Sequence, residues 1–104
     1  MQAMVHNKAS LIQQLSNRSH EIKDFGVKQL GFFGSFAKDA NIDTNSDVDF
    51  LVEFEPGKKT YDNFINLSFY LEELLGRRVE LVTLQSLSKY IGPYILKEVE
   101  NVCL

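Results

Sequence analysis

Apolar residues recur along the chain with two different periods, and the alternation between these periods predicts its helices and strands. Residues 8–24 carry a narrow apolar stripe at spacings of three and four, which predicts an amphipathic helix that Gly26 ends. Residues 61–75 carry a wider stripe at the same spacings and predict a more deeply packed helix that ends at Gly76. The first stripe comprises Leu11, Ile12, Leu15, Ser19 and Ile22, and the second comprises Tyr61, Phe64, Ile65, Leu67, Leu71, Leu74 and Leu75.

Three shorter segments have features typical of β-strands. The clearest is 47–54, whose strict alternation predicts one buried face and one more polar face. Residues 27–33 and 77–83 predict two further strands, the first of which ends at Gly34. In 47–54 the predicted buried residues are Val48, Phe50, Val52 and Phe54, and the opposite face holds Asp47, Asp49, Leu51 and Glu53.

The remaining segments connect these elements and complete the chain. Residues 35–46 form a polar connection, which is expected to open with a turn of helix that has Ser35 near its N-cap. The tail is expected to be helical from about Pro93, a residue that the first turn of a helix tolerates. The apolar residues expected to share one side of this helix are Ile95, Val99 and Val102.

The predicted order is therefore helix, strand, strand, helix, strand, helix. This interleaving predicts an α+β fold in which helices pack on one small mixed sheet. The strand–helix–strand unit over 47–83 has the length of a crossover connection, which makes its two strands parallel. The length of 104 residues predicts a single domain over 1–104. Within it we expect an N-terminal helix over 1–26, a core over 27–83 and a C-terminal helix over 84–104.

Composition and charge exclude several classes of protein. The chain is 44% hydrophobic and 24% charged, which is typical of a globular domain and not of a disordered chain. Its net charge of −3 argues against direct nucleic-acid binding, because neutralising phosphates requires a basic patch. No apolar run is long enough for a membrane span, and the N-terminus lacks the apolar segment of a signal peptide. Cys103 is the single cysteine, so we expect a cytoplasmic protein without an internal disulfide.

Two acids stand side by side at the start of the clearest strand. Asp47 and Asp49 are two positions apart, so their carboxylates lie on the same face. Two like charges this close repel each other, and a divalent cation removes the conflict. Carboxylate oxygens suit Mg²⁺, which commonly binds substrate phosphates as well. The alternative is a solvated strand end at which the acids protect the edge of the sheet.

Two further features belong with these acids. Gly34 ends a strand and Ser35 follows it, and a glycine in such a turn lets a phosphate approach the backbone closely. Glu80 stands mid-strand between apolar residues, where it would face the first two acids as a metal ligand or a proton acceptor. The alternatives are an ordinary turn with a capping serine, and a Glu80 that is exposed or paired with Arg78.

Taken together, these features match the pattern of a known family. The segment "LGFFGSFAKDANIDTNSDVDFLVEF" contains an apolar residue, Gly-Ser, a polar loop and Asp-x-Asp, and "LGRRVELVT" adds a strand with a central acid. Over residues 28–102 the chain resembles the minimal nucleotidyltransferases of the DNA polymerase β-like superfamily. The resemblance implies the palm fold of that superfamily, with its catalytic core over 27–83.

The resemblance also implies a reaction, the transfer of a nucleotide from a triphosphate. A hydroxyl would attack the α-phosphorus in line and release pyrophosphate, with two Mg²⁺ ions bound to the acids. ATP is the expected substrate. The implied catalytic and metal-binding residues are Asp47, Asp49 and Glu80, and the implied nucleotide-binding residues are Gly34, Ser35 and Lys38.

A protein partner is a further implication of the resemblance. Many members of this family act as antitoxins beside a helical HEPN-domain ribonuclease toxin and modify a tyrosine of that toxin. A chain of 104 residues has no room for a second domain to hold an acceptor, which agrees with an acceptor on another chain. We therefore expect AMP transfer from ATP to a hydroxyl of a HEPN-type toxin, and the sequence leaves a homo-oligomer open.

The sequence departs from the family pattern at three places, and these departures keep other functions open. Lys38-Asp39 stands where the family usually has Arg-Gly, the loop over 36–46 is one residue longer than expected, and Glu80 replaces the usual Asp. They favour, as the alternative, a non-catalytic antitoxin that neutralises a HEPN-type partner by complex formation. A third hypothesis is nucleotidyl transfer to a small molecule such as an aminoglycoside, which needs an acceptor pocket completed by dimerisation.

Overall fold

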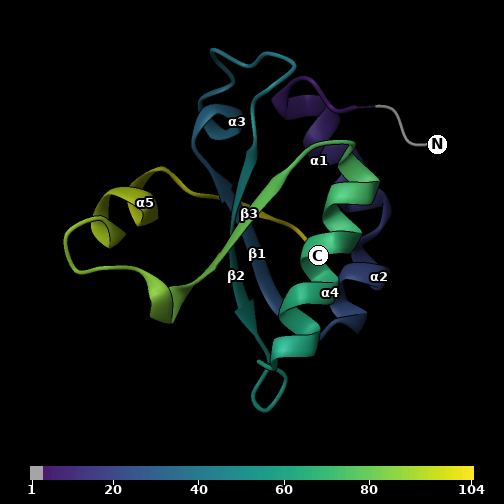
Figure 1. The fold of residues 1–104 in the computed structure, drawn as a ribbon, viewed down its shortest axis with the longest axis vertical. Helices are drawn as coiled ribbons and strands as arrows, with labels where there is room; N and C mark the ends of the chain where they lie inside the picture. The colour runs from purple at the N-terminus through teal and green to yellow at the C-terminus, as the bar shows by residue number, and fades with distance from the viewer. Residues whose placement is uncertain (1–3) are drawn as a thin grey trace.

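Four β-strands form one mixed sheet at the centre of the fold (Figure 1). The structure, a computed structural model, describes residues 4–104. Its strands are β1 (Val27–Phe33), β2 (Val48–Phe54), β3 (Val79–Thr83) and β4 (Glu100–Val102). Its helices are α1 (Lys8–Asn17), α2 (Ser19–Asp24), α3 (Ser35–Lys38), α4 (Tyr61–Leu75) and α5 (Gly92–Glu98), and a 3₁₀ turn, η1, spans Leu84–Ser86.

The strands lie in the order β3-β2-β1-β4. β2 and β3 run parallel and are joined by α4, as the length of the crossover predicts. β1 is antiparallel to both of its neighbours, β2 and β4. The predicted α+β fold, with a small mixed sheet and packed helices, is therefore confirmed.

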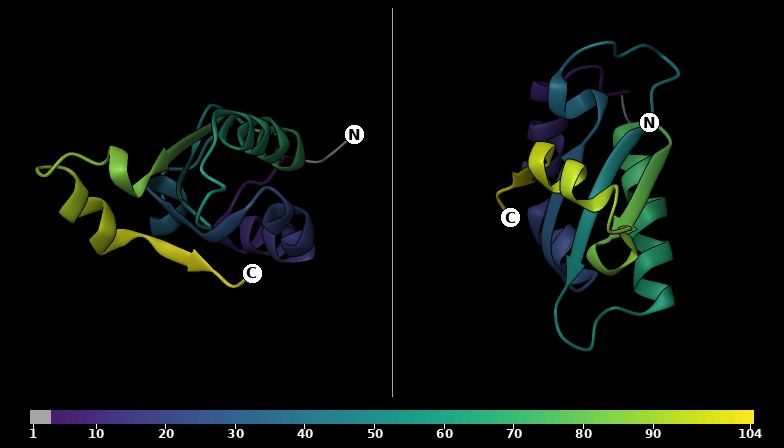
Figure 2. Two further views of the ribbon diagram at one scale, coloured as in Figure 1. Left: turned by 90° about the horizontal axis from the view of Figure 1, so that it is seen from below. Right: turned by 90° about the vertical axis from the view of Figure 1, so that its left-hand side faces the viewer.

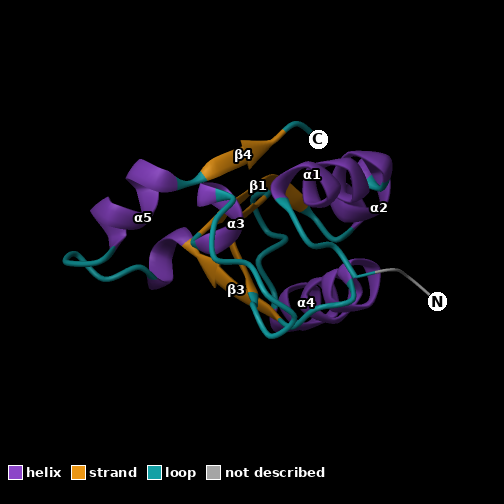
Figure 3. Cartoon of the chain, turned by 90° about the horizontal axis from the view of Figure 1, so that it is seen from above, coloured by secondary structure: helices purple, strands orange, loops and turns teal. Residues whose placement is uncertain are grey.

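The helices α1, α2 and α4 cover one face of the sheet, and α5 lies over the opposite face (Figure 2 and Figure 3). Val48, Phe50 and Val52 belong to the core on the helix-covered face and are fully buried, as their alternation predicts. Burying each such side chain contributes about 1.5–3 kcal/mol. The helix residues that fill this core are Leu11, Leu15, Ile22, Leu67, Leu71, Leu74 and Leu75. Within residues 4–104, the helices are too short or too polar to span a membrane.

The helical segments differ from their predictions in two details. Residues 8–24 form two helices, because the backbone leaves the helical range at Arg18, whose φ is −117°. Tyr61, expected on the apolar face of α4, is 77% exposed. It follows the N-cap Thr60 directly, so it stands at the end of the helix and not along its packed middle.

The tail is not one continuous helix, which corrects the prediction for 84–104. α5 ends at Glu98, after which the backbone becomes extended. Residues Glu100–Val102 form β4, in which Val102 pairs with Leu30 of β1 and is 7% exposed. Pairing with β4 satisfies backbone groups along an edge of β1 that a longer helix would have left open. The three apolar residues predicted to share one side of a helix therefore lie in different elements: Ile95 in α5, Val99 at its C-cap and Val102 in β4.

Candidate active site

The acids of β2 and β3 lie on the face of the sheet opposite to α1, α2 and α4. Part of this face is open, and α5 lies over it (Figure 2). Asp49 stands on β2 opposite to the buried core residues, and its register partners are Glu80 on β3 and Phe33 on β1. Neighbouring strands are about 4.8 Å apart, so Asp49 and Glu80 are direct neighbours on this face. Asp47 immediately precedes β2 and is half-buried, whereas Glu80 is exposed. The structure thus brings two of the predicted acids side by side and places the third next to them.

Crowding of negative charge perturbs Asp49. Burial, the largest cause, and the negative charges of Glu80, Asp47 and Glu98 together raise the pKa of the Asp49 carboxyl from the usual 3.8 to about 6. Glu98 is the last residue of α5, which carries it across the open face of the sheet. The sequence shows Glu98 only as an acid in a predicted helix, so it gave no sign of this position.

The donor set suits Mg²⁺, although the described side chains are not gathered around one point. Carboxylate oxygens are the protein ligands that this ion prefers, and a positive charge would relieve the crowding that raises the pKa of Asp49. Among residues 4–104, however, no three His, Cys, Asp or Glu side chains converge closely enough to hold a metal ion. Ligation by Asp47, Asp49 and Glu80 requires these side chains to turn toward a common point, and it stays a prediction.

Gly34 forms the turn between β1 and α3, and this position requires a glycine. Its φ of 75° lies in the region that favours glycine, and a Cβ there would collide with Oδ2 of Asp49. The turn therefore brings its backbone directly against the acid of β2. Gly34 is itself the N-cap of α3, and no side chain caps this helix. Ser35 is the first helical residue, so it lies next to the N-cap as predicted but does not itself cap the helix.

Two of the residues expected to bind phosphate are in contact with Glu98. The N–H of Gly34 donates a hydrogen bond to Oε1 of Glu98 at 3.0 Å. The Nζ of Lys38 lies 3.7 Å from Oε2 of the same carboxylate. An anionic group of the protein thus already lies at the turn where the family resemblance puts the phosphates of a nucleotide.

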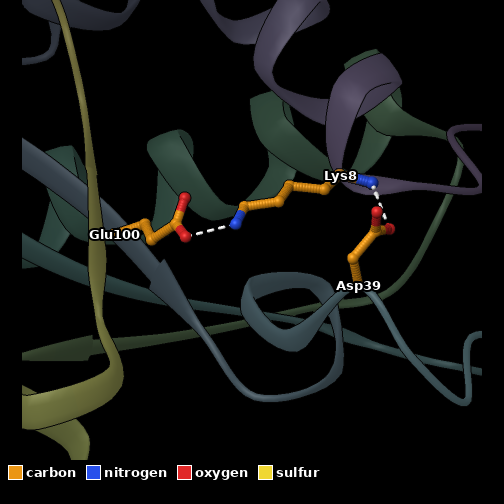
Figure 4. Close-up of polar contacts among 3 residues, drawn as sticks. All are labelled: Lys8, Asp39 and Glu100. Atoms are coloured by element: carbon orange, nitrogen blue, oxygen red, sulfur yellow. Dashed lines mark hydrogen bonds and ion pairs between the residues drawn. The ribbon is translucent and has the colours of Figure 1, made fainter.

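Asp39 connects the same loop to the N-terminal helix (Figure 4). It adopts the left-handed backbone, with a φ of 53°, at a position where the family pattern has glycine. Its Oδ1 accepts a hydrogen bond of 2.9 Å from the backbone N–H of Lys8, in the first turn of α1. The Nζ of Lys8 forms an ion pair with Glu100 of β4. Asp39 therefore ties the loop to α1, and the side chain of Lys8 ties α1 to β4.

Arg77 is a buried residue beside the site that the sequence analysis missed. It is 7% exposed, and the strand predicted to start at Arg77 starts two residues later. Its Nε donates to the carbonyl of Val5 at 2.5 Å, and its Nη1 donates to the carbonyls of Asp43 and Ser46 at 2.7 and 2.8 Å. These bonds fix the loop that leads into β2. In the sequence, the pair Arg77-Arg78 gives no indication of which arginine is buried.

A shallow hollow lies on the same face of the sheet, farther along β2 from the acids. Its volume is about 250 Å³, and its lining combines polar side chains with apolar ones, among them Leu51, Leu84 and Leu96. Leu51 is two residues beyond Asp49 and shares its face of the strand.

Comparison with known proteins identifies the family. The family model described as a nucleotidyltransferase domain matches residues 12–102. The chain belongs to this nucleotidyltransferase family. It is 42% identical over 89 residues to the protein adenylyltransferase MntA of Thermococcus cleftensis, a match that covers 85% of this chain and 88% of the relative. The resemblance seen in the sequence and the expectation of a nucleotidyltransferase are both confirmed.

Solved structures related to this family share the fold. A structure assigned as a minimal nucleotidyltransferase matches with a TM-score of 0.70 and 30% identity, over 86% of this chain and 93% of that chain. A toxin–antitoxin complex with AMP-PNP matches with a TM-score of 0.64 and 20% identity, over 82% of this chain and 69% of that chain. A complex of a tri-AMPylated Shewanella oneidensis HEPN toxin with an MNT antitoxin matches with a TM-score of 0.55 and 19% identity, over 86% and 70%. The predicted polymerase β-like nucleotidyltransferase fold is confirmed.

Proposed function

We propose that this nucleotidyltransferase transfers AMP from ATP to a hydroxyl of a partner protein in a Mg²⁺-dependent reaction. One observation carries the proposal: the Gly34 turn packs directly against Asp49, whose register partner across β2 and β3 is Glu80. A phosphate held at the turn would lie beside two carboxylates, which is what metal-assisted attack on phosphorus needs. The relatives support AMP as the transferred group, since one is a protein adenylyltransferase and another structure contains an AMPylated toxin.

The turn after β1 would bind the phosphates of ATP. The N–H of Gly34 is a donor at the turn, and Lys38 adds a positive charge at the end of α3. Ser35, half-buried at the start of α3, adds a hydroxyl donor. These groups would fix the α-phosphorus in place, and such positioning is the main contribution of a protein to phosphoryl and nucleotidyl transfer.

The acids would complete the site. Asp47, Asp49 and Glu80 would hold Mg²⁺, which when bound neutralises charge on the triphosphate and lowers the pKa of the attacking hydroxyl. The acceptor oxygen forms a bond to the α-phosphorus while the bond from that phosphorus to the bridging oxygen breaks. Pyrophosphate leaves with the electron pair of the broken bond, and the hydroxyl proton passes to solvent at the open face.

We infer that the acceptor is a HEPN-type toxin and that the chain acts as its antitoxin. The structural relatives include complexes of an MNT antitoxin with a HEPN toxin, which supports this choice. The segment around α5 exposes Tyr90, Ile91 and Tyr94 to 74%, 60% and 75% next to the open face. Exposed apolar side chains grouped in this way are suited to a protein partner.

A direct transfer assay tests the proposed function. The purified chain is incubated with Mg²⁺, ATP labelled at the α-phosphate, and a HEPN-type toxin as the candidate acceptor. We expect the label on the partner, and we expect Asp49→Asn to abolish it. Glu53→Gln is the matched control, because Glu53 lies on the same face of β2 but pairs with Lys28 at 3.8 Å. An unlabelled partner with the wild type, or equal labelling with Asp49→Asn, contradicts the proposal.

A second candidate function is neutralisation of the partner without catalysis. Two observations favour it: no three acids converge on a metal position among residues 4–104, and Glu98 lies at the phosphate turn. The double variant Asp47→Ala, Asp49→Ala separates the two functions. If it still protects cells from the partner while transfer is lost, complex formation suffices. If a folded double variant loses protection, neutralisation requires catalysis.

A further inference from the structure

Glu98 contacts two of the three predicted phosphate-binding residues, Gly34 and Lys38, through a hydrogen bond and an ion pair. Its Oε1 accepts the hydrogen bond of 3.0 Å from the N–H of Gly34, and its Oε2 lies 3.7 Å from Nζ of Lys38. Its side chain is 34% exposed, so the contact forms on a face that solvent reaches. The two oxygens of one carboxylate thus take up a backbone donor and a cation that the proposed reaction assigns to phosphate.

We propose that Glu98 occupies the phosphate position in the nucleotide-free enzyme and that the triphosphate must displace it. This inference rests on the proposed function, because it concerns the same turn. A carboxylate and a phosphate oxygen are both anionic acceptors, and one N–H of Gly34 cannot serve both at full strength. Glu98 therefore limits nucleotide affinity, and no sequence pattern or family resemblance used above assigns it a role.

Electrostatics support displacement and not simultaneous binding. The carboxylates of Glu80, Asp47 and Glu98 already place negative charge around Asp49. A triphosphate adds several more negative charges at the same place, so a retained Glu98 carboxylate would repel it at short range. Once displaced, Glu98 leaves the Lys38 ammonium free to pair with phosphate.

The fold allows this displacement at low cost. Gly92 is the only buried residue of α5, and side chains such as Tyr94 and Leu96 are 75% and 49% exposed. A helix with so few buried contacts can shift without opening the core. Beyond it, β4 stays anchored by its pairing with β1 and by the ion pair of Glu100 with Lys8. Glu98 thus lies on a movable helix next to a fixed strand.

Other roles for Glu98 predict different results. If Glu98 were a metal ligand that the reaction needs, removing its charge would weaken Mg²⁺-dependent nucleotide binding. If it only stabilised the turn, removing its charge would lower the melting temperature and leave the affinity for nucleotide unchanged. Only competition with phosphate predicts tighter binding.

The experiment compares wild type, Glu98→Gln and the matched control Glu53→Gln by calorimetric titration with ATP and Mg²⁺. We expect the Kd of Glu98→Gln to fall by about tenfold, in line with a charge-assisted bond to one competing group. We expect Glu53→Gln to leave the Kd unchanged, although it removes the same charge from the same face. The melting temperature of each variant without ligand confirms folding.

A second readout does not depend on nucleotide. In the free protein, the NMR resonance of the Gly34 amide should shift in Glu98→Gln and stay in place in Glu53→Gln. If wild type binds ATP but Glu98→Gln binds no more tightly, this inference is wrong and the proposed function stands. If none of the three proteins binds ATP, the proposed function fails and the inference fails with it. An unchanged Gly34 resonance in Glu98→Gln also overturns the inference.

Discussion

Replacing Asp49 by asparagine is expected to stabilise the nucleotide-free protein while it removes activity. The substitution keeps the size of the side chain but removes a charge that burial and three neighbouring carboxylates disfavour. The pKa of this carboxyl rises from 3.8 to about 6 on folding. One pH unit corresponds to about 1.4 kcal/mol, and solvent screens part of the effect because this carboxyl is only partly buried. The charged form therefore costs the folded wild type about 1–2 kcal/mol at neutral pH. Asp49→Asn should recover most of this free energy.

The pH dependence of the difference follows from linkage. The pKa of the Asp49 carboxyl is higher in the folded state than in the unfolded state, so between pH 6 and pH 4 the folded wild type binds a proton that the unfolded chain does not. Wild type therefore gains stability as the pH falls through 6, and Asp49→Asn does not. The stability difference should be largest at pH 7 and above, and it should vanish near pH 4.

Thermal denaturation in metal-free buffer between pH 4 and pH 8 measures this difference. At pH 7 the melting temperature of Asp49→Asn should exceed that of wild type by about 5 °C or more for a domain of this size. The control Glu53→Gln removes an exposed ion pair with Lys28, so its stability should stay within about 0.5 kcal/mol of wild type. A variant no more stable than wild type at pH 7, or a difference that persists at pH 4, would refute the reasoning.

Three further predictions concern the loops around the site. Gly34→Ala should abolish ATP binding measured by calorimetry, because the added Cβ collides with the carboxylate of Asp49; undiminished binding would show that the turn is not the phosphate site. Arg77→Ala should lower the free energy of unfolding in urea by about 2–3 kcal/mol, because one buried and two partly buried carbonyls lose their donor, and Arg77→Lys should recover only part of it. Asp39→Ala should cost about 1 kcal/mol by the same measurement. Asp39→Asn should cost less, since its amide oxygen can still accept from the N–H of Lys8, and equal losses would contradict this account.

The elements predicted most accurately are those whose pattern is local. The apolar stripe over 61–75 predicts α4 with the same bounds as the structure. Gly76 ends this helix in a left-handed conformation, with a φ of 68°. The alternation in 47–54 gives β2 one residue shorter, with the expected residues buried. In both, all the side chains that define the pattern except Tyr61 are at least partly buried, so the sequence carries the information directly.

The elements predicted poorly are those decided by distant partners. β4 exists because β1 offers an edge about seventy residues earlier in the chain, and nothing in Glu100–Val102 specifies that pairing. Arg77 is buried because three carbonyls from two other segments converge on it. Neither carbonyl positions nor a strand edge can be inferred from residue types at a fixed spacing. Glu98 reaches the candidate site for the same reason, through the fold of the tail.

The structure indicates that Lys38 and its partner Glu98, and not Asp39, are the residues that bear on nucleotide binding at the turn. Of the two residues after β1 that depart from the family pattern, Lys38 and Asp39, Asp39 binds α1 and has no contact with Glu98 or the acids among the described hydrogen bonds and ion pairs. Lys38 keeps a positive charge at the turn, but in the free protein this charge faces Glu98. An arginine there could hold the carboxylate through two parallel bonds, whereas a lysine makes a point contact that exchanges more readily for phosphate.

This exchange makes Lys38 and Glu98 thermodynamically coupled, and a double-mutant cycle measures the coupling. In wild type, Lys38→Ala removes an attraction for phosphate but also frees the enzyme from an ion pair that competes with phosphate. In Glu98→Gln only the first effect remains, so Lys38→Ala should weaken ATP binding more in that background than in wild type. If the loss of affinity is equal in both backgrounds, Lys38 does not exchange between the two anions. ATP binding would then depend on the contact of Lys38 with phosphate, and Glu98 would not affect it.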